Sequence, residues 1–325
     1  MTTLPGISDI HAAAARLAGL TVETPLIESP ALNRRHGGRI LFKPETLQRT
    51  GSFKIRGAYN KLSLLGEEER GRGVVAFSSG NHAQGVAASA AMFGVKAVIA
   101  MPADAPALKV GNVRSMGAEV VPYDRFREDR MTVVRPYMEK GMVLVPPFDD
   151  PAIIAGQGTV GLELMRQAKA LGVDLDAVVV PCGGGGLSSG IALAVKDASP
   201  RTAVWAAEPE HFDDTRRSLA RGERVSNEPG HTSICDALLT PEPGLITFEI
   251  NRRNLAGAVA VSEAAVAQAM RDAMAHLKLV VEPGGCVGLA ALSSGEIDLE
   301  GKCVAVVLSG GNVDFGIYSE IMAAA

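Results

Sequence analysis

The chain has 325 residues, a hydrophobic fraction of 47% and a formal net charge of −4. This length suffices for one large domain or two lobes, and the charge balance argues against nucleic acid or an anionic membrane surface as a partner. The four cysteines form no CxxC pair, which argues against a zinc site and a disulfide framework. The N-terminus lacks the basic start and apolar core of a signal peptide, and no apolar run could cross a bilayer. We therefore expect a cytoplasmic protein.

Short β-branched runs alternate with alanine-rich helical stretches along most of the chain. The predicted strands, with the helices that follow them, are 73–79 before 83–93, 96–101 before 107–116, 118–123 before the charged stretch from 127, 143–147 before 155–171, 177–182 before 187–197, 203–208 before a short helix, and a final strand at 302–309. This alternation predicts an α/β fold of open, mostly parallel sheets with helices on both faces.

No linker or repeat marks a domain boundary, so the division is argued from the pattern. The compact run of strand–helix units predicts a small domain at 71–145. The segments 1–70 and 146–325 would then form a larger second lobe. A ligand site is expected in the cleft between them, since open α/β sheets bind ligands at the carboxyl ends of their strands.

The stretch 50–62, TGSFKIRGAYNKL, places Lys54 at the predicted start of a helix. One interpretation is a solvated surface lysine, with Ser52 as the helix cap. The other is that the Lys54 nitrogen is held in a site because it does chemistry. This stretch alone does not decide between them.

The stretch 181–190, PCGGGGLSSG, lies between a predicted buried strand and a predicted helix. Consecutive glycines let several backbone N–H groups point at one place beside a helix N-terminus, which is typical of a phosphate site. The same stretch approximates GxGxxG, and Glu208 after the next strand resembles a ribose-binding acid. An NAD-dependent oxidoreductase therefore stays open as an alternative.

Two further turns follow predicted strands, SSGNHAQG at 78–85 and LSGGNVD at 308–314. Each taken singly could be only a tight turn. Along the chain, the motifs are, in order, SFKIRGA, SSGNHAQG, AGQGT, PCGGGGL, EPGG and LSGGN. With these motifs in this order, the sequence resembles the fold-type II pyridoxal-phosphate enzymes, specifically the serine/threonine dehydratase and serine racemase family. The resemblance runs from TPLIESPALN to LSGGNVD, and it implies a tryptophan synthase β-like fold and a homodimer.

The resemblance implies a role for several of these motifs around the cofactor. Lys54 would bind pyridoxal phosphate as a Schiff base, and Phe53 would pack against its ring. Gly183, Gly184, Gly185 and Gly186 would bind the phosphate, Asn81 would face the phenolic oxygen, and Ser309 would meet the pyridine nitrogen. A serine can hydrogen-bond to that nitrogen without keeping it protonated, which suits β-elimination better than transamination.

The SSGNH loop would bind the substrate in the same family. Ser79 matches the serine that lies opposite the lysine and acts as the second acid/base in racemases. In dehydratases the loop binds the substrate carboxylate, here through Ser79, Gly80, Asn81 and His82. This loop does not separate racemase from dehydratase activity.

The stretch EPEHFDD resembles the divalent-cation site of the family. Glu208, the carbonyl of Phe212 and Asp214 would then supply oxygen ligands of the kind that Mg²⁺ or Ca²⁺ prefers, and Mn²⁺ is a third candidate. The alternative is a solvated acidic turn.

Substrate choice is predicted from the stretch YDRFREDR, where an arginine could bind a second substrate carboxylate bidentately. Arg127 is our candidate, with Arg125 and Arg130 beside it; the alternative is a charged surface helix start. Together with SICDALLTPEPGLITF, this favours a dehydratase and ammonia-lyase acting on 3-hydroxyaspartate, with serine and threonine close behind. A serine or aspartate racemase is the alternative. The chain ends soon after LSGGNVD, so we expect a catabolic enzyme without a C-terminal regulatory extension.

Overall fold

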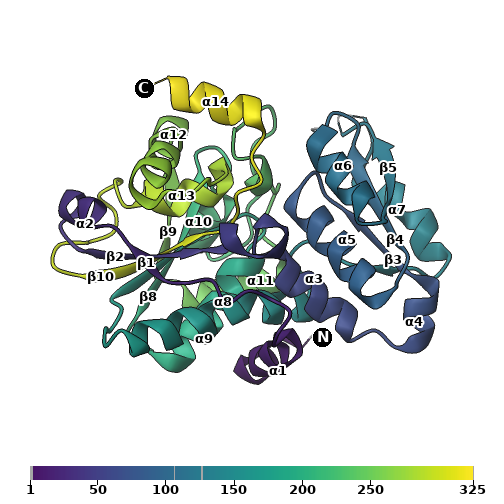
Figure 1. Ribbon diagram of the computed structural model, residues 1–325, viewed down its shortest axis with the longest axis horizontal. Helices are drawn as coiled ribbons and strands as arrows, with labels where there is room; N and C mark the ends of the chain where they lie inside the picture. The colour runs from purple at the N-terminus through teal and green to yellow at the C-terminus, as the bar shows by residue number, and fades with distance from the viewer. Residues whose placement is uncertain (1–2, 106, 126, 325) are drawn as a thin grey trace.

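The computed structural model describes residues 3–105, 107–125 and 127–324. It consists of two lobes, each built on its own sheet, with α3 where they meet (Figure 1). All strand pairs are parallel except β1 with β2. The predicted α/β fold with mostly parallel sheets is confirmed.

The larger sheet has six strands. In sheet order they are β1 (Ile27–Glu28), β2 (Arg39–Pro44), β10 (Cys303–Leu308), β7 (Ala177–Pro181), β8 (Ala203–Pro209) and β9 (Gly257–Val261). The smaller sheet has the order β5 (Glu119–Tyr123), β4 (Ala97–Pro102), β3 (Val74–Phe77) and β6 (Val143–Leu144). All four strands of the smaller sheet fall within 71–145, while the boundaries of the two domains stay a prediction.

Helices cover both faces of each sheet. The large sheet packs against α13 (Pro283–Ala291) on one face, with α12 (Glu263–Asp272) and α14 (Phe315–Ala323) outside it, and against α8 (Pro151–Ala170) and α9 (Gly186–Ala198) on the other. The small sheet packs against α5 (Asn81–Phe93) and α6 (Ala107–Ser115) on one face and α7 (Arg130–Glu139) on the other. The remaining helices are α1 (Ile7–Leu17), α2 (Pro30–His36), α3 (Lys54–Ser63), α4 (Glu67–Arg72), α10 (Asp214–Arg221) and α11 (Leu245–Asn254), with short helical turns η1 (Glu45–Leu47), η2 (Arg49–Gly51), η3 (Asp236–Leu238) and η4 (Ala273–Leu277).

Strand β3 shows how the sequence produces this layering. Val74 and Ala76 point into the core under α5, whereas Val75 and Phe77 point into the core under α7. Successive side chains of a strand alternate between faces, so a strand covered on both sides must be apolar throughout. Among the described residues, no helix has the length and apolar content needed to span a membrane.

Helices α8 and α9 approach each other closely because glycines face one another. A Cβ built on Gly190 would lie 2.5 Å from the backbone nitrogen of Gly158 and 2.5 Å from the carbonyl oxygen of Ile154. Both atoms are main chain and cannot swing away. The contact fixes the position of α9, which begins at Gly186, within the large lobe.

We expect Gly190→Ala to lower the free energy of unfolding by about 1–3 kcal/mol, because the added methyl overpacks a helix–helix contact. Gly111→Ala is the matched control: this glycine lies inside α6, and a Cβ there meets nothing within 4 Å. That change should be neutral or stabilising by up to about 1 kcal/mol. Urea unfolding measures both, and equal stabilities for the two variants would contradict the close α8–α9 approach.

Candidate active site

A cleft of ≈ 550 Å³ opens between the two lobes, at the carboxyl ends of strands β3 and β8. An inner cavity of ≈ 40 Å³ adjoins it and shares Lys54, Asn81 and Glu282 with the cleft wall. The predicted residues that line the cleft are Lys54, Ser79, Gly80, Asn81, His82 and Phe212. Those that line the inner cavity are Phe53, Lys54, Asn81, Gly183, Gly185, Gly186 and Ser309. Segments distant in the sequence thus meet at one place.

Lys54 is the first residue of α3, and its side chain is partly exposed toward the cleft. Its Nζ donates a hydrogen bond to the carbonyl oxygen of Pro147 at 2.8 Å and lies 5.1 Å from the centre of the Phe53 ring. Burial lowers the pKa of Lys54 to about 8, with Glu282 opposing the shift. The surface-lysine interpretation is wrong: Ser52 does not cap the helix, and its hydroxyl is buried without a partner among the described residues.

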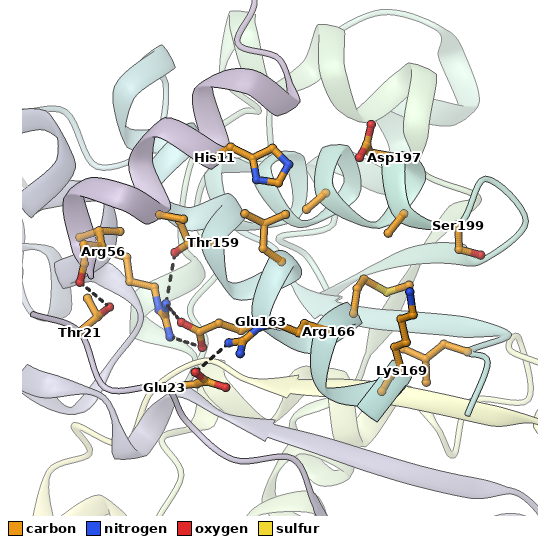
Figure 2. Close-up of a pocket in the computed structure, with 18 of the residues that line it drawn as sticks. His11, Thr21, Glu23, Arg56, Thr159, Glu163, Arg166, Lys169, Asp197 and Ser199 are labelled. Atoms are coloured by element: carbon orange, nitrogen blue, oxygen red, sulfur yellow. Dashed lines mark hydrogen bonds and ion pairs between the residues drawn. The ribbon is translucent and has the colours of Figure 1, made fainter. Parts of the chain in front are cut away.

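The start of α3 is held by a fully buried arginine, two residues after Lys54. Arg56 Nε donates to Glu45 at 2.8 Å, and its Nη1 donates to Glu163 at 2.6 Å and to Thr159 at 3.2 Å. Figure 2 shows Arg56, Thr159 and Glu163 joined in the wall of a separate cavity of ≈ 1140 Å³ beside α1, α8 and α9. Lys54 does not line that cavity.

The glycine loop after β7 carries backbone donors that have no acceptor. Gly184, Gly185 and Gly186 are buried, and within the described part of the chain none of the N–H groups of Gly183–Gly186 donates a hydrogen bond. Buried unpaired N–H groups are rare, and at the N-terminus of α9 they attract an anion. Side chains would also crowd this loop, since a Cβ on Gly184 would lie 2.5 Å from the Phe148 ring. The loop therefore fits the phosphate of the implied cofactor.

Ser309 and Asn81 flank the inner cavity. The hydroxyl of Ser309, which is 5% exposed, makes no hydrogen bond to a described residue. Asn81 Nδ2 instead donates to Glu282 at 2.5 Å, and its Oδ1 accepts from Asn312 at 2.8 Å. Ser309 thus has a free hydroxyl for a ring nitrogen, whereas Asn81 already has two partners.

His82 is buried at the start of α5. Its Nε2 lies 2.8 Å from the carbonyl oxygen of Val145, so Nε2 carries the proton, and Nδ1 has no partner among the described residues. Burial, with the nearby Lys54, lowers the pKa of His82 to about 3, so the ring is neutral. Ser79, one turn earlier, is partly exposed in the cleft.

The predicted cation ligands lie beside the N-terminus of α10. Glu208 accepts hydrogen bonds from the backbone N–H groups of Thr215 at 3.0 Å and Arg216 at 2.9 Å. Asp214 accepts from Asn227 through Oδ1, while its buried Oδ2 has no partner among the described residues. Burial raises the pKa of both carboxyl groups, and each lies close to another acid. Within the described chain, no group of three or more His, Cys, Asp or Glu side chains forms a metal cluster.

Arg127 does not line the cleft, where the sequence analysis expected it. Its side chain is 86% exposed, contacts Asp124 at 3.6 Å and is not part of the cleft wall. Arg125 and Arg130 line the cleft instead; Arg125 pairs with Asp104 at 2.7 Å, and Arg130 lies 4.7 Å from the centre of the Phe77 ring. Arg130 forms no ion pair with a described carboxylate, so it is the cleft arginine free to bind an anion.

Sequence reasoning missed five charged residues in the cleft wall, Lys109, Glu128, Asp129, Asp236 and Glu282. Lys109 from α6 and Asp236 from η3 form an ion pair of 2.8 Å that joins the two lobes. Glu282 lines both cavities, and burial raises its pKa to about 7. The signal for Glu282 was its place in EPGG, but a lone acid before Pro-Gly-Gly also suits a surface turn.

The buried amine of Lys54 predicts a pH-dependent stability of the cofactor-free protein. Unfolded Lys54 keeps its proton up to its ordinary pKa of 10.5, whereas the folded protein releases it near 8. Between these values the unfolded state binds more protons, so the stability of the wild type rises with pH relative to Lys54→Met. We expect this difference to change by about 1–3 kcal/mol, reduced because the side chain is partly open to solvent.

Denaturant unfolding at pH 7.5, 9 and 10.5 measures this difference. Lys169→Met, at an exposed lysine of α8, is the control and should show no such trend. A wild-type advantage that is constant with pH would mean that Lys54 is not desolvated.

Comparison with known proteins places this geometry in a family. The family described as pyridoxal-phosphate dependent enzyme matches residues 17–310. The chain is 44% identical to an L-threo-3-hydroxyaspartate ammonia-lyase of a Pseudomonas species, over 98% of this chain and 99% of that protein. It is 43% identical to an L-threonine ammonia-lyase of Thermotoga maritima, over 97% of this chain and 78% of that protein. The structure of maize serine racemase matches with a TM-score of 0.92 and 37% identity, covering 99% of this chain and 98% of that one.

Proposed function

The chain belongs to the pyridoxal-phosphate-dependent enzymes, and on that premise we propose that it is an ammonia-lyase that removes water from 3-hydroxyaspartate. Serine and threonine are the next most favoured substrates in this proposal. The observation that carries the proposal is that three groups meet at the cleft and its adjoining inner cavity: a desolvated lysine, a glycine loop whose N–H groups have no acceptor within the described chain, and an arginine that pairs with no described carboxylate. The named relative that acts on L-threo-3-hydroxyaspartate supports this substrate.

The alternative of a nicotinamide-dependent oxidoreductase is not supported. Glu208, which would have bound the ribose, is fully buried and accepts hydrogen bonds from the N-terminus of α10 with both carboxylate oxygens. The glycine loop instead lies within the residues that match the family of pyridoxal-phosphate dependent enzymes.

Several residues of the cleft have a role in the proposed reaction. Pyridoxal phosphate, when bound, supplies the ring that withdraws electrons from the substrate's α-carbon. Lys54, whose pKa burial lowers to about 8, loses its proton more readily than a solvated lysine and can take the α-proton. Residues 79–82 would hold the α-carboxylate at the N-terminus of α5. Departure of the β-hydroxyl as water and hydrolysis of the product give a keto acid and ammonia.

Arg130 would select the substrate by its second carboxylate. It lies at the N-terminus of α7, its guanidinium rests against the Phe77 ring, and it forms no ion pair with a described carboxylate. A planar guanidinium can bind a carboxylate with two parallel hydrogen bonds. Serine and threonine lack that carboxylate and would leave Arg130 unused.

Serine racemase activity is the second candidate. It is favoured by Ser79, whose side chain lies in the cleft and makes no hydrogen bond to a described residue. A hydroxyl opposite Lys54 could return a proton to the other face of the α-carbon. A substrate panel that scores ammonia release against stereoinversion separates the two activities.

The decisive test of the cofactor assignment is Lys54→Ala. Because the lysine acts covalently, we expect loss of borohydride-trapped cofactor and of nearly all turnover, with unchanged circular dichroism. Lys61→Ala, on the same helix, is the control and should retain the trapped cofactor. A Lys54→Ala protein that still trapped pyridoxal phosphate and released ammonia would reject the assignment.

Substrate choice is tested with Arg130→Ala. Loss of hydrogen bonds between charged groups should cost 3-hydroxyaspartate about 1.5–3 kcal/mol in kcat/KM and leave serine nearly unchanged. Arg127→Ala is the matched control, since its side chain is exposed outside the cleft; Arg125→Ala tests the neighbouring cleft arginine. Equal losses for both substrates would indicate general damage to the site.

A divalent cation at Glu208, the Phe212 carbonyl and Asp214 is also part of the proposal. Its support is the buried Oδ2 of Asp214, which has no partner among the described residues and lies beside a second carboxylate, an arrangement that Mg²⁺ or Ca²⁺ would neutralise. Free cation at a hundred times its dissociation constant would stabilise the fold by about 2.7 kcal/mol.

We therefore expect chelation to lower the melting temperature, magnesium or calcium to restore it, and Asp214→Asn to abolish the response. A wild type that is indifferent to chelator would leave only an acidic turn. A homodimer and a cytoplasmic location stay predictions from the sequence.

A further inference from the structure

Helix α11 contacts the glycine loop, yet the proposed reaction assigns it no role. Its N-cap is Gly244, which has no side chain that could accept hydrogen bonds from the first turn. Asp149 takes that place from a distant part of the chain. Its carboxylate accepts from the three backbone N–H groups of residues 245–247, at 2.8 to 3.2 Å. A carboxylate at this end of a helix satisfies its free N–H groups and is attracted by the helix dipole.

The approach of Asp149 depends on glycine at position 244. A Cβ built on Gly244 would lie 2.7 Å from Thr247 Oγ1 and closer still to Asp149 Oδ1. Asp149 belongs to the segment that links β6 to α8, and two residues earlier in this segment the carbonyl oxygen of Pro147 accepts from Lys54 Nζ at 2.8 Å. The segment that binds the lysine amine therefore also caps α11.

The first turn of α11 is bonded to the glycine loop. Thr247 is fully buried, and its hydroxyl donates to the carbonyl oxygen of Gly184 at 2.6 Å. The N–H of Gly244 donates to the same oxygen at 3.3 Å. Four residues after Thr247, Asn251 Nδ2 donates to the Ser188 hydroxyl at 3.0 Å, in the first turn of α9. One face of α11 thus holds both the loop and the helix that follows it.

The held carbonyl fixes the direction of the next N–H group. The Gly184 C=O and the Gly185 N–H belong to one peptide plane, and no described peptide bond is cis. In a trans peptide these two bonds point in opposite directions. The oxygen faces α11, so the Gly185 N–H faces away from α11. Gly185 lines the inner cavity and no described residue of α11 does, so the cavity lies on the side to which this N–H points.

Gly185 is suited to this close contact. Its φ of 93° lies in the left-handed region, which glycine adopts without strain. A Cβ built on Gly185 would lie 2.9 Å from both Cβ and Oγ1 of Thr247. A side chain at position 185 would therefore displace α11 and release the Gly184 carbonyl.

We propose that α11 positions the phosphate-binding donors of the glycine loop, with Thr247 holding the Gly184 peptide and Asp149 holding Thr247. A peptide that is fixed in this way is ordered on folding and not on binding, which favours affinity. Neither Thr247 nor Asp149 lines the cleft or the inner cavity, so both are positioning residues. The inference rests on the proposed function in that pyridoxal phosphate is the group bound.

Thr247→Val removes the hydroxyl donor and keeps the shape of the side chain. The full chain is stripped of cofactor and titrated with pyridoxal phosphate or with pyridoxal, which lacks the phosphate, and borohydride trapping measures capture. We expect the dissociation constant of pyridoxal phosphate to rise about tenfold, as for the loss of a hydrogen bond to a charged group, and that of pyridoxal to stay unchanged. Thr247→Ser keeps the hydroxyl and should restore wild-type capture of both.

Thr202→Val is the matched control for Thr247→Val. Thr202 is 1% exposed, and its hydroxyl likewise donates to a backbone carbonyl, that of Leu175, at 2.7 Å. Thr202 lines neither the cleft nor the inner cavity. Its replacement should lower stability by a similar amount and change the capture of neither ligand.

Asp149→Ala tests the same contacts from their other end and keeps the test decisive if Thr247→Val does not fold. Loss of the cap loosens the first turn of α11, so the dissociation constant of pyridoxal phosphate should rise about threefold with that of pyridoxal unchanged. Ser262→Ala, which removes the N-cap of α12, is the control and should change neither constant.

The ratio of the two dissociation constants decides the outcome. Equal weakening of both ligands by Thr247→Val and Asp149→Ala would indicate general damage and overturn the inference, and so would constants that do not change. A wild type that binds pyridoxal as tightly as pyridoxal phosphate would also overturn it. If the constants change as expected but the wild type releases no ammonia from 3-hydroxyaspartate, the proposed function is rejected and the inference stands.

Discussion

The buried guanidinium of Arg56 is the interaction on which the position of Lys54 depends. Buried ion pairs stabilise a fold only when their geometry is good and every donor is satisfied. Here Glu45, just after β2, and Glu163, within α8, both bind the guanidinium directly, and neither Arg56 nor Glu45 has an exposed side chain. The first turn of α3 is thereby tied to the large sheet and to α8 at once. The backbone of Lys54, two residues before Arg56, is anchored by these contacts, of which Figure 2 shows those of Arg56 with Thr159 and Glu163.

The segment 145–147, which links β6 to the large lobe, is held from both sides of the cleft. His82 donates to the carbonyl of Val145, and Lys54 donates to the carbonyl of Pro147. Both donors lose part of their preference for charge, because burial lowers both pKa values. A neutral His82 can hold the segment without adding a positive charge beside Lys54. The ion pair of Lys109 with Asp236 and the hydrogen bonds of Asn81 with Glu282 and Asn312 are further links between the lobes.

The sequence alone predicted the layered α/β fold, because buried parallel strands can be recognised as runs of β-branched residues. It also predicted the motifs that meet in the site, because glycines at strand ends can be recognised in the sequence. It missed β2, whose RILFKP contains two charged residues, and β9, whose GAVAV is rich in small residues; in the structure β2 pairs with β10, and β9 pairs with β8. It chose Arg127 in a stretch of three arginines, because spacing does not show which side chain faces the cleft. It missed Glu282 because the groups that change its proton affinity are distant in the chain.

The unpaired backbone donors of Gly183–Gly186 explain why the site needs its glycines and its ligand together. A folded chain satisfies almost all of its buried N–H groups internally, so leaving several without acceptors costs stability. An anion at the N-terminus of α9 can accept hydrogen bonds from these N–H groups, and the helix dipole favours its negative charge. Binding of an anion therefore offsets the cost in stability. Any side chain at Gly184 would meet Phe148 and close the approach. A phosphate bound at this loop would supply the acceptors that its N–H groups lack within the described chain.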